Sequence, residues 1–466
     1  MQTHDSPSCA AVLGAGASGR AAVRALLRRG WTVALILREQ EAESAKDLEA
    51  AGARLLVGNP PDSLREWASL HPGSLAVFSP GIPMDSEEMI AALEADMSIV
   101  GELALGARFF RGRMVAVTGS KGKSSVVKLL ADTLSANGHS AVPCGNYGTP
   151  LCEVADQDPA PEFAIVECSS YQLQTADEHL KPEAAVLLNL SRDHLVRHGT
   201  MEAYRDAKMR IFAWQDASEL AFLPKAPDYP GYGAVNPYRL ASRFQDLYPT
   251  HPAEYFGVGD GVRWRYCAHK VWDRSEGVAY DVGGSYFDCD VLGPAAAAAV
   301  GILVRLGLSR EAIEKGFRDF APLPHRMQTV GAAHGVAWID NSKATNLASL
   351  LASVAMAPKP VVLIAGGRLK EPLSLTGEEL AKAGVRSAFT IGTCASDMEA
   401  AWAPAVPTKD CGTMDEAVRA ALLDAAELTT GSILLAPGTE SFDQFRSYAE
   451  RGDSFLQSLH QHTAQS

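Results

Sequence analysis

The chain alternates short apolar runs with amphipathic stretches, and this alternation recurs in three successive regions. In the first region the run CAAVL (residues 9–13) leads into the turn GAGASGR, a stretch with helical spacing, and a second run ending near Leu37. Apolar runs bounded by turns are typical of buried strands, and apolar positions three and four residues apart are typical of helices. Repeated strand–turn–helix units predict an α/β protein with largely parallel sheets.

The second region begins at the apolar run of residues 114–117, which enters the segment GSKGKSS and then another helical pattern. Two later runs, in AIVECSSYQL and AAVLLNLSRDHL, pass directly into polar residues. Because α/β sheets hold their ligands at the carboxyl ends of strands, these polar residues are candidates for a site. Residues 221–290 are aromatic-rich and resist assignment, although VRWRYCAHKVW alternates like one strand of a hairpin.

The third region follows APLPHRM, whose prolines suit a linker between domains. Its predicted strands are GVAWIDNS, KPVVLIAGG, SAFTIG and GSILLAPG, and one helix is predicted to start with a capping box from Thr413 to Glu416. The pattern predicts three α/β domains, at residues 1–101, 102–322 and 323–466. We expect the first and third to be Rossmann-like and the central one to be a P-loop-type ATPase domain with a mixed or parallel sheet.

Composition narrows the class of protein. Hydrophobic residues make up 47% and charged residues 21% of the chain, as in a well-packed globular protein. No apolar run has the length of a membrane span, and the start lacks a signal-peptide pattern. Eight scattered cysteines without a C-x-x-C motif suit a reducing cytoplasm, and a net charge of −13 without a basic block disfavours nucleic acid. We expect a cytoplasmic protein without a membrane span or a nucleic-acid partner.

A glycine fingerprint opens the chain. Gly14, Gly16 and Gly19 fit G-x-G-x-x-G, in which glycines let the backbone approach a pyrophosphate. A dinucleotide site also requires an acidic residue at the end of the second strand, where only Glu39 is nearby. Two interpretations stay open: a tight strand-to-helix turn, or the cofactor site of an oxidoreductase, which would bind NAD(P).

The segment GSKGKSS has the chemistry of a phosphate-binding loop. Gly119 and Gly122 free the backbone to wrap phosphate oxygens, Lys123 would reach the β- and γ-phosphates, and Ser124 would offer a hydroxyl to Mg²⁺. The alternative is a Gly/Lys-rich surface turn, but strand, loop and helix follow in the right order. Val117 stands where common NTPase loops have their first glycine, which favours a relative with a shorter signature.

Three further side chains are candidates for a metal centre. Glu167 and His194 each follow a predicted strand, although alone they would be a solvated carboxylate and a structural histidine. Lys208 shares one helix face with Met201 and Tyr204. From this pattern alone, we expect the lysine to extend its ammonium group into solvent.

Several segments together resemble the Mur ligases, the ATP-dependent amide-bond-forming enzymes of peptidoglycan precursor synthesis. They are, in order, VTGSKGKSS, ECSSYQL, NLSRDHLVRHGTMEAYRDAKMRIF, LPHRM, WIDNSKATN, AGGRLK and APGTESFDQFRSYAERGDSF. The resemblance covers the chain apart from residues 221–294. Three of its segments, SPGI (residues 79–82), SKATN and DQF, resemble signatures of those family members that add D-glutamate to UDP-N-acetylmuramoyl-L-alanine.

The resemblance implies a mechanism and a division of labour. The three domains would bind the UDP-sugar, ATP and glutamate, in that order, and the protein would act as a monomer. The γ-phosphoryl group of ATP would move to the alanyl carboxylate, and the amine of glutamate would displace phosphate from the acyl phosphate. Two Mg²⁺ ions would assist.

The resemblance also implies site residues. The nucleotide would contact Gly119, Ser120, Lys121, Gly122, Lys123, Ser124, Ser125, Arg326 and Asn341. The metal ligands would be Ser124, Glu167, His194 and a carbamylated Lys208, and the catalytic residues Lys123, His194 and Lys208. The UDP-sugar would contact Ser18, Asn146 and Arg197, and glutamate would contact Lys343, Thr345, Lys370, Ser441 and Tyr448. Carbamylation needs a neutral amine, which burial near cations favours by lowering the pKa of a lysine.

The chain departs from the family pattern at three places. VLGPAAAAAV stands where the family has H-N-x-x-N, a segment that contacts adenine. The family's aspartate before SKAT is Asn341, with Asp340 one place earlier, and its acidic uracil contact is Leu37. Two alternatives therefore stay open: a binding protein that has lost turnover, and a folylpolyglutamate-synthase-like ligase, which would leave SPGI and DQF unexplained.

Overall fold

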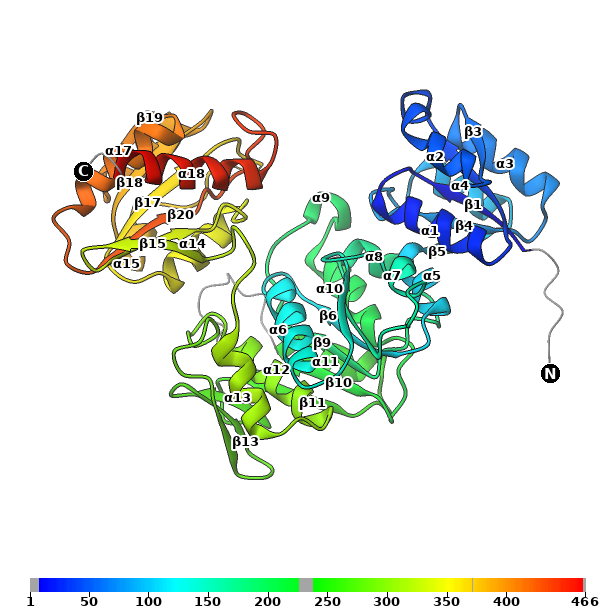
Figure 1. Ribbon diagram of the computed structural model, residues 1–466, viewed down its shortest axis with the longest axis horizontal. Coiled ribbons are helices and arrows are strands. Elements are labelled where there is room, and N and C mark those ends of the chain that lie inside the picture. Colours follow the sequence, from blue (N-terminus) through cyan, green and yellow to red (C-terminus); the bar gives the residue numbers. More distant parts are fainter. Residues whose placement is uncertain (1–7, 226–237, 371, 464–466) are drawn as a thin grey trace. The chain divides into compact units, whose positions relative to one another are not determined.

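The computed structural model describes residues 8–225, 238–370 and 372–463. It contains three separate sheets, of five, nine and six strands, each flanked by helices (Figure 1). The chain divides into two compact units, the first with the five- and nine-stranded sheets and the second with the six-stranded sheet. Among the described residues, the second unit comprises Cys289–Leu292 and the chain from Phe320 onwards. The predicted α/β class is confirmed, whereas the boundaries at residues 101 and 322 stay a prediction.

The N-terminal sheet is parallel throughout, with the strand order β3-β2-β1-β4-β5. Its strands are β1 (Cys9–Leu13), β2 (Thr32–Leu37), β3 (Arg54–Val57), β4 (Leu75–Phe78) and β5 (Ser98–Gly101). Its helices are α1 (Ala17–Arg28), α2 (Lys46–Ala50), α3 (Pro60–Leu70), α4 (Glu87–Glu94) and α5 (Glu102–Phe109). Both strands predicted in this region are present, and Leu37 is the last residue of β2.

The glycine fingerprint forms a tight turn between β1 and α1. A Cβ atom on Gly19 would lie 1.9 Å from the carbonyl oxygen of Gly14, so the first turn of α1 can approach the end of β1 only without a side chain there. Strand β4 pairs with β1, and Ser79 of SPGI follows β4 directly. The Ser79 hydroxyl donates a hydrogen bond of 2.8 Å to the carbonyl of Leu13. Close backbone packing therefore accounts for Gly19 without any ligand.

Replacing Gly19 with alanine is expected to destabilise the first unit, because an added methyl group would force β1 and α1 apart. Overpacking of this kind costs about 1–3 kcal/mol of unfolding free energy or more. Gly16→Ala is the matched control, since a Cβ atom on Gly16 meets nothing within 4 Å. Urea denaturation followed by circular dichroism compares the two variants, and equal stability would show that the turn opens to admit the methyl group.

The central sheet has the strand order β14-β13-β12-β11-β10-β9-β6-β8-β7, parallel from β7 to β12 and antiparallel from there to β14. Its strands are β6 (Arg113–Thr118), β7 (Ala141–Gly145), β8 (Phe163–Glu167), β9 (Ala184–Leu187), β10 (Leu220–Pro224), β11 (Ala253–Gly257), β12 (Trp264–Cys267), β13 (Lys270–Asp273) and β14 (Val278–Asp281). Its helices are α6 (Lys123–Ala136), α7 (Leu151–Val154), α8 (Ser170–Gln174), α9 (Leu195–His198), α10 (Met201–Met209), α11 (Tyr238–Leu247), α12 (Gly293–Arg305) and α13 (Arg310–Asp319).

The stretch VRWRYCAHKVW forms a whole hairpin, so the prediction of a single hairpin strand is wrong. Strands β12 and β13 pair antiparallel from Trp264 opposite Asp273 to Cys267 opposite Lys270. Ala268 and His269 between them both have positive φ, 50° and 66°, as two-residue hairpin turns require. Such turns are usually formed by glycine, asparagine or aspartate, so the sequence of Ala268 and His269 does not predict one.

In each of the two outermost strands of this sheet, β7 and β14, one backbone N–H group is missing or already bonded to a side chain. Strand β7 contains Pro143, which has no backbone N–H group. At the other edge, the backbone N–H of Asp281 in β14 donates to a carboxylate oxygen of Glu314 in α13 at 2.9 Å. Glu314 in turn pairs with Arg310 at 2.7 Å.

The C-terminal sheet has the strand order β15-β16-β20-β17-β18-β19, in which only β15 is antiparallel to its neighbour among the described strands. Its strands are β15 (Gln328–Ala333), β16 (Val336–Asp340), β17 (Val361–Gly366), β18 (Val385–Ile391), β19 (Thr408–Gly412) and β20 (Gly431–Leu435). Its helices are α14 (Leu347–Met356), α15 (Gly377–Ala383), α16 (Ala395–Trp402), α17 (Met414–Ala425) and α18 (Tyr448–Thr463). All four predicted strands are present, and β15 and β19 are additional.

Helix α17 begins at the predicted cap but without the predicted reciprocal bond. The Thr413 hydroxyl accepts from the backbone N–H of Glu416, whereas the Glu416 carboxylate pairs with Arg419 instead of returning to the cap. A full capping box occurs at Thr376 and Glu379, where α15 begins. No helix in the described ranges combines the length and apolar character that crossing a membrane requires.

Candidate functional site

The GSKGKSS segment connects β6 to α6, and strand, loop and helix occur in the predicted order. Val117, at the position of the missing glycine, is a fully buried residue of β6, so the loop starts only after Thr118. Gly122 has the left-handed conformation (φ 82°) that turns the chain into α6. The first N–H groups of a helix have no partner within the helix, and together with the helix dipole they form an anion site.

Polar residues after β9 hold this loop from the opposite side. The side-chain amide of Asn189 accepts from the backbone N–H of Lys121 at 2.9 Å and donates to the Lys121 carbonyl at 3.0 Å. The Ser120 hydroxyl donates to the Ser191 carbonyl at 3.2 Å and lies 3.1 Å from the Tyr204 hydroxyl. Ser120 and Lys121 are predicted nucleotide contacts, whereas Asn189 and Ser191 were not predicted, because in NLSRDHL the pattern singles out only His194.

Two lysines share one carbonyl of the loop. The ammonium groups of Lys123 and Lys208 each donate to the Gly119 carbonyl at 2.8 Å. Lys208 is 1% exposed, and its ammonium lies 4.7 Å from the centre of the Tyr204 ring. Burial, and secondarily the charge of Lys123, lowers the pKa of Lys208 well below its usual value. The expectation of a solvent-facing ammonium group is therefore wrong, since the loop carbonyl offers a partner inside.

A buried carboxylate faces the start of α6. Glu167 is 3% exposed, and its two oxygens accept from the Ser124 hydroxyl at 2.5 Å and from the Asn146 amide at 2.6 Å. It is thus not a solvated strand-end residue. A carboxylate and a hydroxyl are the oxygen ligands that Mg²⁺ prefers, so this pair fits a magnesium ion. Asn146 is predicted to contact a UDP-sugar, and its side-chain amide is hydrogen-bonded to this candidate metal ligand.

His194 immediately precedes α9 and has a left-handed backbone, with φ 54°. Its Nδ1 lies 3.1 Å from the Tyr171 hydroxyl, and its Nε2 lies 3.8 Å from a carboxylate oxygen of Asp193. Asp193 also pairs with Lys121 at 3.6 Å. Burial lowers the pKa of His194, which favours the neutral imidazole that binds metal ions.

Arg197 connects the central sheet to the SPGI segment. Its guanidinium donates to the Ile82 carbonyl at 2.6 Å and to the Gln174 side chain at 3.2 Å. Ser18 is the second residue of α1 and is half-buried. Of the residues predicted to contact the UDP-sugar, Asn146 is hydrogen-bonded to a candidate metal ligand, and Arg197 reaches the N-terminal part of the chain.

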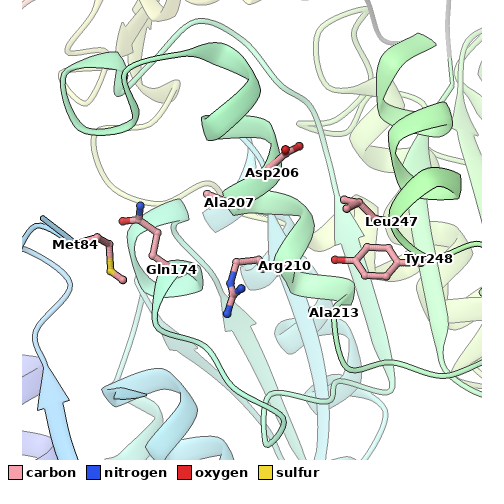
Figure 2. A pocket seen from close by; sticks show the side chains of 8 residues that line it. All are labelled: Met84, Gln174, Asp206, Ala207, Arg210, Ala213, Leu247 and Tyr248. Atoms are coloured by element: carbon pink, nitrogen blue, oxygen red, sulfur yellow. The ribbon is translucent and has the colours of Figure 1, made fainter. Parts of the chain in front are cut away.

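A cavity of about 450 Å³ lies beside α10, outside the predicted site residues (Figure 2). Figure 2 shows Arg210 between Gln174 and Tyr248, and its guanidinium donates to the Leu173 and Ala176 carbonyls at 2.8 Å each. The lining residues are Met84, Gln174, Asp206, Ala207, Arg210, Ala213, Leu247 and Tyr248. Helix α10 therefore carries both Lys208 and two residues that line the cavity, Asp206 and Ala207.

In the second unit, the residues predicted to contact glutamate occur on four segments. The Lys343 ammonium lies 3.9 Å from the centre of the Tyr448 ring, and that of Lys370 lies 3.3 Å from a carboxylate oxygen of Glu440. Ser441 is 2% exposed and Thr345 is half-buried. The structure thus brings Lys343 and Tyr448 into contact, and Lys370 next to the residue that precedes Ser441.

Two residues predicted to contact the nucleotide lie near the start of this unit. Asn341 accepts from the backbone N–H of Met327 at 3.2 Å and donates to the Ser353 hydroxyl at 2.6 Å, so its amide stabilises the unit itself. Asp340 is fully buried and lies 2.6 Å from Nδ1 of His325. Arg326, next to that histidine, is half-buried.

The departure VLGPAAAAAV enters helix α12. Every residue from Gly293 to Leu303 is buried, and the run contains no polar side chain. The segment therefore offers hydrophobic packing at the place where the family has its asparagines.

Comparison with known proteins agrees with these motifs. The profile described as the Mur ligase middle domain matches residues 117–232. UDP-N-acetylmuramoylalanine–D-glutamate ligase of Acidobacterium capsulatum is 32% identical over 95% of this chain and 94% of its own length, and that of Frankia casuarinae is 36% identical over 95% and 92%. The crystal structure of MurF from Acinetobacter baumannii, 18% identical, shares the fold with a TM-score of 0.59, covering 92% of this chain and 91% of that one. The chain therefore belongs to the UDP-N-acetylmuramoylalanine–D-glutamate ligases of the Mur ligase family.

Proposed function

We propose that this protein joins D-glutamate to UDP-N-acetylmuramoyl-L-alanine at the expense of ATP. The γ-phosphorus forms a bond to an oxygen of the alanyl carboxylate as its bond to ADP breaks. The amine of D-glutamate then forms the C–N bond, phosphate leaves with its oxygen, and the amine proton passes to solvent. Such chemistry depends on positioning and on cationic stabilisation of phosphate oxygens.

The observation that carries this proposal is the phosphate loop with its surroundings. Lys123 at the N-terminus of α6 provides a cation for the β- and γ-phosphates, and the Ser124–Glu167 pair would hold Mg²⁺. When bound, the metal ion neutralises phosphate charge during transfer. The residues Gly119, Ser120, Lys121, Gly122 and Ser125 would wrap the phosphates, with Arg326 and Asn341 completing the nucleotide site.

Lys208 is proposed as a carbamylated ligand of a second Mg²⁺, together with His194. Its burial and lowered pKa favour the neutral amine that carbamylation requires. The oxygens of a carbamate would also replace an ammonium group with the ligand type that magnesium prefers.

On the substrate side, Ser18, Asn146 and Arg197 are proposed to contact the UDP-sugar. Lys343, Thr345, Lys370, Ser441 and Tyr448 are proposed to bind D-glutamate, whose two carboxylates suit the two lysines. The cytoplasmic location, the monomeric state and the assignment of UDP-sugar, ATP and glutamate to residues 1–101, 102–322 and 323–466 stay predictions.

Phosphate release tests the proposed function. It should require ATP, Mg²⁺, UDP-N-acetylmuramoyl-L-alanine and D-glutamate together, and omitting any one should reduce the rate to background. An equal rate with L-glutamate would refute the stereochemical assignment, and a rate independent of the UDP-sugar would refute the activity. Nucleotide binding without turnover would favour the alternative of a binding protein, and activity on a pterin substrate would favour a folylpolyglutamate-synthase-like enzyme.

Nucleotide selectivity is expected to be relaxed, because α12 presents buried apolar residues where the family contacts adenine. Neutral hydrogen bonds contribute roughly 0.5–1.5 kcal/mol each, so losing one or two lowers the preference for adenine by about tenfold or more. Turnover with GTP should therefore be higher, relative to ATP, than in a ligase that retains H-N-x-x-N. The kcat/KM values for both nucleotides in the two enzymes measure this. Equal strictness would mean that residues 221–290 recognise adenine.

A further inference from the structure

Arg451 in α18 is a fully buried arginine whose hydrogen bonds within the described part of the chain are all to neutral groups. Its relative exposure is 0%, and its guanidinium donates to the Ser342 hydroxyl and carbonyl, both at 3.0 Å. It also donates to the Gly366, Thr439 and Glu440 carbonyls, at 3.4, 3.1 and 3.1 Å. Among the described residues, none of its hydrogen bonds or ion pairs is to a carboxylate.

These acceptors lie on the segments that carry the proposed glutamate contacts. Ser342 precedes Lys343 and Thr345, and Gly366 begins the segment that leads to Lys370. Thr439 and Glu440 precede Ser441, and α18 itself begins with Tyr448. One guanidinium thus connects four segments that are far apart in the sequence.

Ser342 extends the connection to the helix. Its hydroxyl accepts from Arg451 and donates to the Tyr448 carbonyl at 2.7 Å, while its N–H donates to Asp340 at 2.8 Å. Lys343 follows directly, and its ammonium lies against the Tyr448 ring. The position of this lysine relative to the tyrosine therefore depends on the bonds that Arg451 and Ser342 make.

The charge of Arg451 is disfavoured mainly by burial, which lowers the pKa of its guanidinium to about 10. Asp443 and Asp340 are the nearby acidic groups that favour its charged form, but neither is hydrogen-bonded to it. A buried charge without a direct counter-ion is costly, and a planar guanidinium fork that satisfies several carbonyls at once is the cation best suited to such a position.

We propose that Arg451 is the positioning residue of the amino-acid site: its hydrogen bonds align the four segments that hold the dicarboxylic substrate. This inference rests on the proposed function. Lysine has the same charge but cannot form the five-bond fork, so Arg451→Lys separates alignment from charge.

The experiment measures KM for each substrate in Arg451→Lys. We expect KM for D-glutamate to rise about tenfold or more, because a point charge cannot replace the fork. KM for ATP and for UDP-N-acetylmuramoyl-L-alanine should stay within about twofold, since Arg451 bonds to none of their proposed contacts. The nearest of these, Asn341, is held by its own hydrogen bonds to Met327 and Ser353. Arg446→Lys is the matched control, because Arg446 is 92% exposed and pairs with Glu450 on the surface.

Ser342→Ala provides a second test that keeps the arginine and removes one acceptor and the link to Tyr448. It should raise KM for D-glutamate in the same direction by a smaller factor. An unchanged KM for D-glutamate in both variants, or an equal rise for all three substrates, would overturn the inference while leaving the proposed function intact. If the unmodified protein shows no D-glutamate-dependent phosphate release, the proposed function fails and the inference with it.

Discussion

Lys123→Ala is expected to lower kcat for phosphate release by about 10³-fold or more, the scale on which removal of a transition-state cation or donor acts. The ammonium group stands at the N-terminus of α6, bonded to the Gly119 and Ser120 carbonyls at 2.8 and 3.2 Å, where a triphosphate would replace those acceptors. Charge-assisted bonds of this kind are strong. The ammonium of Lys208 donates to the same Gly119 carbonyl, but in the proposed function it is neutralised by carbamylation and would not replace the lost cation. Steady-state phosphate release at saturating substrates measures the effect.

Lys128→Ala on the same helix is the control, because Lys128 pairs with Asp132 four residues away. It should retain nearly full activity, and both variants should unfold at nearly the temperature of the unmodified protein. Substantial turnover by Lys123→Ala would contradict the assignment of this loop to the phosphates.

Lys208→Ala is expected to abolish most turnover as well, but through a different loss. According to the proposed function, this side chain would carry a carbamate that holds the second Mg²⁺, and alanine would leave space in its place. A short carboxylic acid such as acetate or formate should therefore restore part of the activity, by supplying an oxygen ligand.

Two controls make this rescue specific. Lys208→Met fills the same space with an apolar chain, so it should be inactive and resistant to rescue. Lys123→Ala should also fail to respond to the acid, because its missing group is a cation. Mass spectrometry of the unmodified protein in bicarbonate should detect carbamylated Lys208, and an unmodified lysine under turnover conditions would refute the carbamate.

Much of this fold can be predicted from the sequence because its strands, turns and helices are specified by residues close to one another in the chain. The apolar run before GSKGKSS, the glycines and the helical spacing after it act within a few residues of one another, and β6, the loop and α6 follow from them. Lys208 shows where such reasoning ends. Periodicity places it on the face of Tyr204, but its inward direction depends on the Gly119 carbonyl, which lies far away in the sequence.

The parts of the candidate site that escaped prediction are held together by long-range polar contacts. Asn189 bonds to the backbone of Lys121, and Arg451 bonds to Ser342, in each case across a large sequence separation. No spacing rule connects such pairs. Glu416 is a smaller case, because a local capping box competes with an equally local pair to Arg419, and propensity alone does not decide between them.

The two outer strands of the central sheet, β7 and β14, affect the tendency of the protein to aggregate. Exposed strand edges are templates for pairing with other chains. At one edge Pro143 removes a donor from β7, and at the other edge Glu314 occupies the N–H of Asp281 at the end of the four-residue strand β14. When the edges of two molecules meet, they therefore cannot form a continuous row of backbone hydrogen bonds. We expect this to oppose aggregation through the nine-stranded sheet.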